Sequence, residues 1–502
     1  MKRSLTRIAH CLLAAGVCLG AAPGVAQSEL PRTLIDLPQI GEPADRSISP
    51  MEERRLGAQI VAQLYGFDYV LEDPEISEYI SALGWKLAAA SNTKPQELEF
   101  FLINDARINA FALPGGYIGI NAGLLLAAST ESEVAGVMGH ELAHVTQRHI
   151  ARTVEGSQAA NLATWAAVLA AILIGSADPD VVIGALSLGQ AINYQRQVNY
   201  TRAHELEADR IGIQTMARAG FAPEGMVSFF TKLEQQSRLY GSGLPEFLRT
   251  HPLNTTRISE ARARAAEMPA PLRRVEPVDF ELMRARARVL LAERPSEPLN
   301  YFTGLLGAGQ DSPGNRYGQA LALARLGQSE QALEVLAPVL EAHPRQANLL
   351  LLKGQIELFA RNHDAALATF TRALELYPRY APAIFAKADA LITVGRPEAA
   401  REVLIGHEQA LGTRLQTYNL LAQAARDSGN MPEASFQMAN FLFLRGNSGG
   451  AIGQLDAGLR LDNLSPAERA RLSAKREEVR ATLPPNWRPP EYRTRATLQG
   501  SD

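Results

Sequence analysis

Residues 130–146 read TESEVAGVMGHELAHVT, and this stretch decides how the first half of the chain folds. Thr130 with Glu133 makes a capping box at a helix start, and we expect the helix to continue to about Arg152. Apolar residues between these ends repeat at helical spacing, so one face of the helix is buried. The stretch therefore predicts a capped, half-buried helix that carries the motif HELAH at 140–144.

The two histidines of the motif form a metal-binding pattern. His140 and His144 leave one face of the helix one turn apart, because four residues turn a helix by about 400°. Two neutral imidazole nitrogens can then reach one Zn²⁺ at about 2.0–2.1 Å. Glu141 flanks the open position of the metal, where it can act as general base and then as proton donor to a leaving amine. His149 falls roughly opposite His140 on a continuous helix and is interpreted as a structural hydrogen-bonder.

A second acidic helix supplies the predicted third ligand. Residues 202–212 read RAHELEADRIG, with Glu205 and Asp209 one turn apart on a stripe of small residues. We assign Glu205 as the third zinc ligand and Asp209 as the acceptor for the far nitrogen of a ligating histidine. Glu207 falls on a solvated face and is the weaker candidate. The alternative is a salt-bridged surface helix with no metal.

The chain resembles the CAAX-prenyl-protease and HtpX-like family of zinc metallopeptidases in four segments: HELAH at 140–144, ELEADRIG at 205–212, NAFALPGG at 109–116, and Thr250-His251-Pro252 with Arg257. The resemblance covers about residues 50–265, without the family's multiple long membrane spans, so prenylated substrates are not implied. It implies a zincin-like fold with one Zn²⁺ per subunit, held by His140, His144 and Glu205, and Glu141 as general base.

The resemblance also implies where a substrate lies. Residues 98–104 and 109–120 predict strands, the second segment forming a strand pair with a Pro-Gly-Gly turn. A peptide would lie along the edge strand at Asn109 and Ala110, paired through its main chain. Asn109 either polarises the scissile carbonyl or only forms a turn.

His251 has three open roles. It can be a fourth zinc ligand that displaces the catalytic water, a donor that stabilises the tetrahedral oxyanion, or a structural histidine that packs its loop. We prefer a latent protease that His251 holds shut until a partner opens it.

Further helices are expected at 51–91 and at 196–219, the second ending at Gly220 as a left-handed stop. Arg202 and Arg257 pair either with the site carboxylates or with a substrate carbonyl.

From about residue 310 a period of 34 residues appears. Ala332, Ala366, Ala400 and Ala434 share it, as do Gly327, Arg361, Gly395 and Gly429. This is the register of tetratricopeptide repeats, which stack into a solenoid that holds segments of other proteins. The alternative is a scaffold that only braces the protease. The predicted fold class is therefore α+β, mostly α, followed by an α-solenoid.

The N-terminus predicts export. Residues 1–26 have a basic start, a small-apolar core and small residues before Ala26, which predicts a signal peptide cleaved near Ala26 and a periplasmic protein. An uncleaved anchor is the alternative. Both cysteines lie in this segment. The formal net charge of −3 shows no excess of basic residues, so nucleic acid is not an expected partner.

Residues 159–192 form two apolar stretches around a short polar break. They predict either a buried or lid-forming helical hairpin, or a surface that contacts a bilayer or an apolar partner.

The predicted division is a signal peptide (1–26), a Pro-rich lead (27–49), a protease domain (50–265), a linker with connecting helices (266–310), a repeat solenoid (311–485) and a tail (486–502). Together with export and repeats, the resemblance implies an endopeptidase that cleaves misfolded or stalled outer-membrane proteins and docks the outer-membrane assembly machinery through its repeats. The rival function is a chaperone or assembly adaptor in which the repeats carry the main role.

Overall fold

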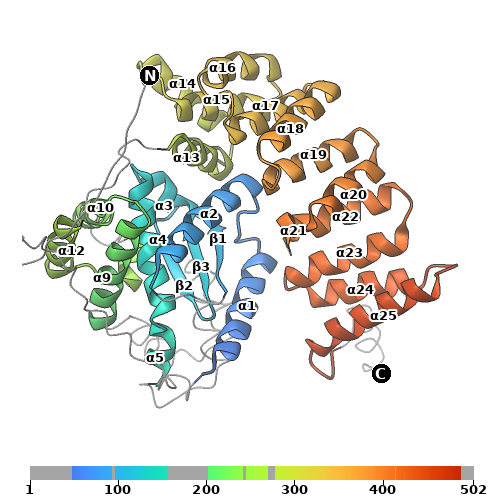
Figure 1. Ribbon diagram of the computed structural model, residues 1–502, viewed down its shortest axis with the longest axis horizontal. Coiled ribbons are helices and arrows are strands. Elements are labelled where there is room, and N and C mark those ends of the chain that lie inside the picture. Colours follow the sequence, from blue (N-terminus) through green and yellow to red (C-terminus); the bar gives the residue numbers. More distant parts are fainter. Residues whose placement is uncertain are drawn as a thin grey trace, which may run out of the picture. The chain divides into compact units, whose positions relative to one another are not determined.

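The structure is a computed structural model, and it describes residues 48–92, 97–155, 202–240, 245–268, 277–412 and 414–487. The chain divides into two compact units, Met1–Glu42 and Pro43–Asp502, and all described residues belong to the second. In that unit a small sheet with its helices precedes a long series of helix pairs (Figure 1). This confirms the predicted class, α+β and mostly α, followed by an α-solenoid.

The described elements of the first part are α1 (Pro50–Gly66), α2 (Pro74–Ala90), β1 (Glu99–Ile103), β2 (Ala110–Leu113), β3 (Tyr117–Asn121), α3 (Ala122–Ala127), α4 (Glu131–Thr146), α5 (His149–Glu155), α9 (Arg202–Arg218), α10 (Glu224–Tyr240), α11 (Glu246–Thr250) and α12 (Thr255–Glu267). The central strand β3 is parallel to β1 and antiparallel to β2. Strands β2 and β3 are the predicted pair, and their turn uses Gly115 and Gly116 at φ of 75° and 90°. Among the described residues, β2 is an edge of the sheet.

Two helices, rather than one helical run, fill the predicted segment 51–91. Asp68 adopts a left-handed φ of 57°, and the chain then crosses to β1, where Val70 pairs with Ile103. The break follows Gly66 and precedes Pro74, two residues that commonly end and begin helices.

Helices α4 and α9 cross at close range. Helix α4 starts at the predicted cap, with the Thr130 hydroxyl accepting a hydrogen bond from the backbone N–H of Glu133 at 3.2 Å. The reciprocal half of the predicted capping box does not form, because the Glu133 carboxylate accepts from the Ser129 N–H at 2.7 Å. At the crossing Gly139 lies against Gly212 of α9, and a methyl group added to Gly212 would lie 3.0 Å from the backbone nitrogen of His140. That distance is shorter than an ordinary van der Waals contact. The two glycines therefore permit this approach.

The predicted end of α4, about Arg152, is wrong. The helix ends at Thr146, and Arg148 then adopts a left-handed φ of 51°. The Arg148 guanidinium lies 3.1 Å from a carboxylate oxygen of Glu53, which anchors the turn on α1. The chain re-enters a helix as α5, so His149 does not continue the helical register of α4.

The helices of the second part are α13 (Val278–Leu291), α14 (Ser296–Gly307), α15 (Pro313–Arg325), α16 (Ser329–Ala342), α17 (Ala347–Phe359), α18 (His363–Leu376), α19 (Ala381–Thr393), α20 (Pro397–Gly406), α21 (Glu408–Leu411), α22 (Leu415–Asp427), α23 (Met431–Leu444), α24 (Ser448–Leu459) and α25 (Pro466–Ala481). The four alanines of the predicted register are all buried. Its turn positions all have positive φ: Gly327 (76°), Arg361 (60°), Gly395 (74°) and Gly429 (80°). The repeat register is confirmed.

A buried ion cluster joins the two parts. Arg286 of α13 donates to both carboxylate oxygens of Asp73, the N-cap of α2, at 2.8 Å. The same guanidinium lies 2.9 Å from Glu75 and donates to the Tyr317 hydroxyl at 2.9 Å. Burial raises the pKa of Glu75 to about 7, although Arg286 opposes the shift. One arginine therefore balances two buried carboxylates.

Several predicted features lie outside the described residues: the signal peptide 1–26, nearly all of the lead 27–49, the apolar segment 159–192 and nearly all of the tail 486–502. They stay predictions. The helix expected at 196–219 is described from Arg202 as α9, and Gly220 follows it at φ of 82°, as predicted. Within the described ranges, no helix combines the length and apolar character needed to cross a bilayer.

Substitution of Arg286 by alanine is expected to lower the free energy of unfolding by about 3–5 kcal/mol, because two buried carboxylates lose their counter-ion. Denaturant unfolding measures this loss. The raised pKa of Glu75 means that its stabilising contribution is present below about pH 4.5 and is lost as pH rises through about 7. Above that pH Glu75 is ionised and needs Arg286 as its counter-ion. The fall in unfolding free energy caused by Arg286→Ala should therefore be larger at pH 8 than at pH 5. The exposed pair Arg294–Glu297 provides a control, because Arg294→Ala should cost less than about 1 kcal/mol. Equal effects of the two substitutions would contradict the role of the cluster.

Candidate active site

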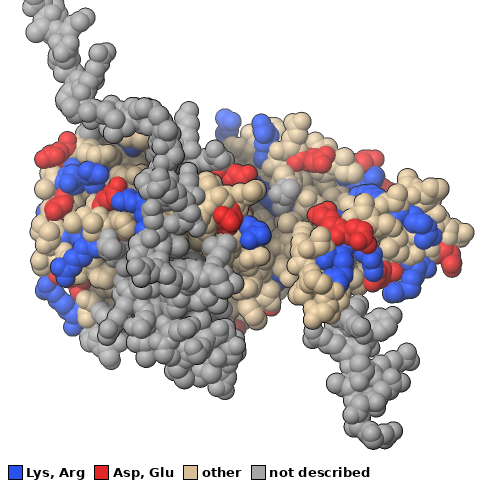
Figure 2. All heavy atoms as spheres, turned by 90° about the horizontal axis from the view of Figure 1, so that it is seen from below, with Lys and Arg blue, Asp and Glu red and all other residues tan. Residues whose placement is uncertain are grey.

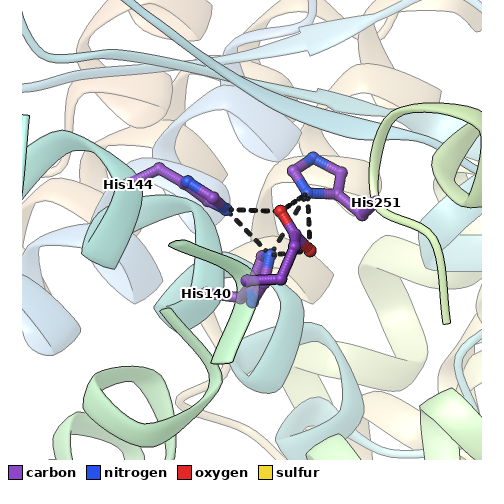
Figure 3. A group of neighbouring side chains, drawn as sticks. His140, His144 and His251 are labelled. Atoms are coloured by element: carbon purple, nitrogen blue, oxygen red, sulfur yellow. Dashed lines mark hydrogen bonds and ion pairs between the residues drawn. The ribbon is translucent and has the colours of Figure 1, made fainter. Parts of the chain in front are cut away.

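Four side chains converge on one buried point (Figure 3). His140 and His144 lie on α4 and Glu205 lies on α9, whereas His251 directly follows α11 as its C-cap residue. One ligating atom of each lies within 4.8 Å of all the others. Nε2 of His144 lies 3.0 Å from Nε2 of His140 and 3.4 Å from a carboxylate oxygen of Glu205. The fold thus brings the three residues predicted as metal ligands together, with His251 as a fourth donor.

Asp209 lies behind this group, beside the outer nitrogen of His140. Its carboxylate is 2.9 Å from Nδ1 of His140, and Arg257 donates to both of its oxygens at 2.7 Å. The same guanidinium lies 2.6 Å from Glu205. Burial would raise the pKa of Asp209, but Arg257 and His140 outweigh it and hold that pKa below its usual value. Of the two arginines left open by the sequence, Arg257 pairs with the site carboxylates, whereas Arg202 is exposed.

Glu141 is fully buried beside the four donors. One carboxylate oxygen lies 3.5 Å from Nε2 of His251, and no described side chain donates a hydrogen bond to either oxygen. Burial raises the pKa of Glu141, against opposing effects of His251, His140 and the Ala112 backbone. Such a carboxylate is poised to take up a proton.

The predicted substrate strand lies next to α4, which packs against β2. Ala110 is the first residue of β2 and Asn109 precedes it; both are buried. The backbone carbonyl of Asn109 accepts a hydrogen bond from the Asn121 N–H at 2.9 Å, which fixes the start of β2 on β3. The side-chain oxygen of Asn109 has no hydrogen-bond partner among the described residues. It is therefore a buried acceptor for which the described chain supplies no donor.

His251 lies inside the donor group rather than at its rim. Nδ1 is 3.0 Å and 3.3 Å from the two carboxylate oxygens of Glu205 and 3.3 Å from Nε2 of His140. Its ring stacks on Phe247 with centroids 4.8 Å apart. Burial lowers the pKa of His251, but Glu205 and Glu141 outweigh this and raise it overall. This position suits a ligand.

The sequence missed a second histidine contact. Nδ1 of His149 lies 2.8 Å from Nδ1 of His144, and Nε2 lies 3.3 Å from a carboxylate oxygen of Glu207. Burial lowers the pKa of His149 to about 3, so its ring is neutral. Glu207 was predicted to lie on a solvated face. In the structure its carboxylate contacts His149 and also lies 3.1 Å from the Arg152 guanidinium. The left-handed turn at Arg148 could not be read from helical spacing.

The donor set fits a divalent transition-metal ion. Imidazole nitrogens with one carboxylate oxygen are ligands that such ions accept in catalytic sites. The buried carboxylate of Glu141, without a donor from any described side chain, stands next to them. Together these residues can hold a metal and move a proton beside it.

Comparison with known proteins agrees with this geometry. The profile described as peptidase family M48 matches residues 74–265, which contain all of the site residues above. The beta-barrel assembly-enhancing protease of Escherichia coli (strain K12) is 32% identical over 96% of this chain and 98% of its own length. The chain belongs to peptidase family M48. The predicted metallopeptidase class is therefore confirmed.

Other relatives extend the comparison. The beta-barrel assembly-enhancing protease of Yersinia pestis is 34% identical to this M48 peptidase over 88% of this chain and 91% of its own. The mitochondrial metalloendopeptidase OMA1 of Arabidopsis thaliana is 31% identical over 42% of this chain and 41% of its own. Tetratricopeptide-repeat profiles match residues 317–381 and 360–410 of this M48 peptidase. The predicted repeat family is confirmed.

Proposed function

We propose that this protein is a periplasmic zinc endopeptidase that cleaves misfolded or stalled outer-membrane proteins. The observation that carries the proposal is the buried group of His140, His144 and Glu205, with Glu141 beside it and an edge strand alongside. The relatives named beta-barrel assembly-enhancing proteases support the choice of substrate class.

Zinc is the proposed ion, with one per subunit, held by His140, His144 and Glu205. When bound there, zinc lowers the pKa of water and polarises the scissile carbonyl. The Asp209 carboxylate, 2.9 Å from Nδ1 of His140, is proposed to orient that ring. Arg257 holds Asp209 and Glu205 in place through contacts of 2.6–2.7 Å.

Glu141 is the proposed general base. Its buried carboxylate has a raised pKa, so it can take a proton from the attacking water and then pass it to the leaving amine. Helix α4, which carries the base, packs against β2, so the base lies on the helix next to the proposed substrate strand.

The substrate is proposed to lie as an added strand along β2, starting at Asn109 and Ala110. Main-chain pairing would accept many sequences, because it does not read side chains. The buried side-chain oxygen of Asn109 supports a contact with a substrate N–H, while polarisation of the carbonyl would require its amide group instead.

The repeats are proposed to dock unfolded outer-membrane proteins or their assembly machinery. Basic and acidic side chains are interspersed on the face that Figure 2 shows. Nucleic acid is not among the proposed partners, because the formal net charge of the chain is −3. The apolar segment 159–192 remains the proposed site of peripheral membrane contact.

His251 is proposed to latch the enzyme shut. Nδ1 lies among the other donors, within 3.3 Å of His140 and Glu205, so it fills the space that an attacking water needs. A partner that draws the residues after α11 away would free that space.

Substitution of Glu141 by glutamine is expected to leave zinc stoichiometry unchanged and to lower cleavage of an unfolded polypeptide by at least about 100-fold, because the base is removed and the ligands remain. Glu131→Gln, on the same helix and bonded to Tyr79, is the matched control and should keep its activity. Full in-cell function with Glu141→Gln would favour the chaperone or adaptor instead.

Substitution of His251 by alanine is expected to raise basal proteolysis roughly tenfold. This corresponds to a loss of about 1.4 kcal/mol in the stability of the closed state relative to the open state. Cleavage rates of the purified protein on an unfolded substrate measure this. Arg249→Ala, exposed on α11, serves as control. A large fall in rate would reject the latch and support the oxyanion role, and no change would remove His251 from the mechanism.

A further inference from the structure

The two α4 histidines each point one nitrogen at the shared centre and the other at a partner. For His140 the outer nitrogen is Nδ1, which lies 2.9 Å from Asp209. For His144 the inner nitrogen is Nε2, 3.0 Å from Nε2 of His140, and the outer Nδ1 lies 2.8 Å from Nδ1 of His149. The outer partner of His144 is therefore another histidine.

Metal ligation by Nε2 of His144 would fix the direction of this hydrogen bond. Two ring nitrogens 2.8 Å apart are bonded only when one of them carries a proton. If Nε2 of His144 ligates a metal, that nitrogen carries no proton, so the neutral ring of His144 has its proton on Nδ1. Nδ1 of His144 then donates and Nδ1 of His149 accepts. His149 consequently carries its proton on Nε2, which faces the Glu207 carboxylate at 3.3 Å.

Backbone and packing also hold His149 in this place. Its ring is fully buried and stacks on His204, with centroids 4.4 Å apart and planes 10° apart. It lies at the start of α5, directly after Arg148 at φ of 51°. The contact of Arg148 with Glu53 anchors that turn. The position of the ring is thus determined from three sides.

We propose that His149 is a positioning residue of the metal centre: it fixes the tautomer and ring orientation of His144, and Glu207 fixes those of His149. The inference rests on the proposed zinc site, since it needs Nε2 of His144 to be a ligating atom. It makes the two α4 histidines unequal, because His140 has a carboxylate behind it and His144 a neutral imidazole. Loss of such an outer partner commonly weakens metal binding about 10- to 100-fold.

Zinc affinity, measured by competition with a chromophoric chelator, tests this role independently of catalysis. His149→Ala is expected to raise the zinc dissociation constant about 10- to 100-fold relative to the unmodified protein. His149→Asn is expected to recover most of the loss, because the amide oxygen lies near the position of Nδ1 and accepts the same hydrogen bond. Arg210→Ala, exposed on α9, is the matched control and should bind zinc like the unmodified protein.

Two further readouts separate positioning from packing. Glu207→Ala should weaken zinc binding in the same direction as His149→Ala, by a smaller factor, although Glu207 lies at the rim of the site. Cobalt-substituted His149→Ala should show an altered visible absorption spectrum, because the orientation of His144 on the ion changes. A packing role would lower the melting temperature and leave the spectrum unchanged.

Unchanged zinc affinity and cobalt spectrum in His149→Ala would overturn the inference, as would a His149→Asn protein that binds zinc as weakly as His149→Ala. If His149→Ala does not fold, Glu207→Ala decides: weakened zinc binding supports the inference, and unmodified affinity overturns it. Failure of the unmodified protein to bind zinc would instead overturn the proposed zinc site, so the two failures are distinguishable.

Discussion

The close crossing of α4 and α9 is the contact on which the active site depends. Gly139 and Gly212 bring the two backbones so near that an added methyl group on Gly212 would lie 3.0 Å from the backbone nitrogen of His140. Glu205 and Asp209 lie one turn apart on α9. At this separation the Glu205 carboxylate lies 3.6 Å from Nε2 of His140, and the Asp209 carboxylate lies 2.9 Å from Nδ1 of the same ring. A wider crossing would separate the ligands on α4 from the carboxylate on α9.

The electrostatics of the site follow from this crossing. Three carboxylates, those of Glu141, Glu205 and Asp209, are buried there. Arg257 pairs with two of them, and His251, whose pKa is raised by Glu205 and Glu141, lies beside those two. Buried charges are tolerated only when they are paired or coordinate a metal. The balance of the described residues therefore favours a divalent cation at the donor group, while burial raises the pKa of Glu141 and keeps it ready to accept a proton.

Local periodicity made much of this architecture predictable. Four-residue spacing placed His140 and His144 on one face, a stripe on α9 singled out Glu205 and Asp209, and the 34-residue register located the turns of the repeats. Backbone conformations outside that periodicity escaped prediction. Arg148 enters the left-handed region although it is not glycine, and this ends α4 early and turns His149 toward His144. No spacing rule signals that turn, because it depends on the distant carboxylate of Glu53.

X-ray absorption spectroscopy of the zinc-loaded protein tests most directly whether the two helices build one metal site. The account predicts one zinc per chain with nitrogen and oxygen ligands only, imidazole scattering, and metal–ligand distances of about 2.0–2.1 Å. It also predicts that this signature is lost when Glu205 is replaced by alanine. Zinc that stays bound with the same coordination in the Glu205→Ala protein would contradict the account.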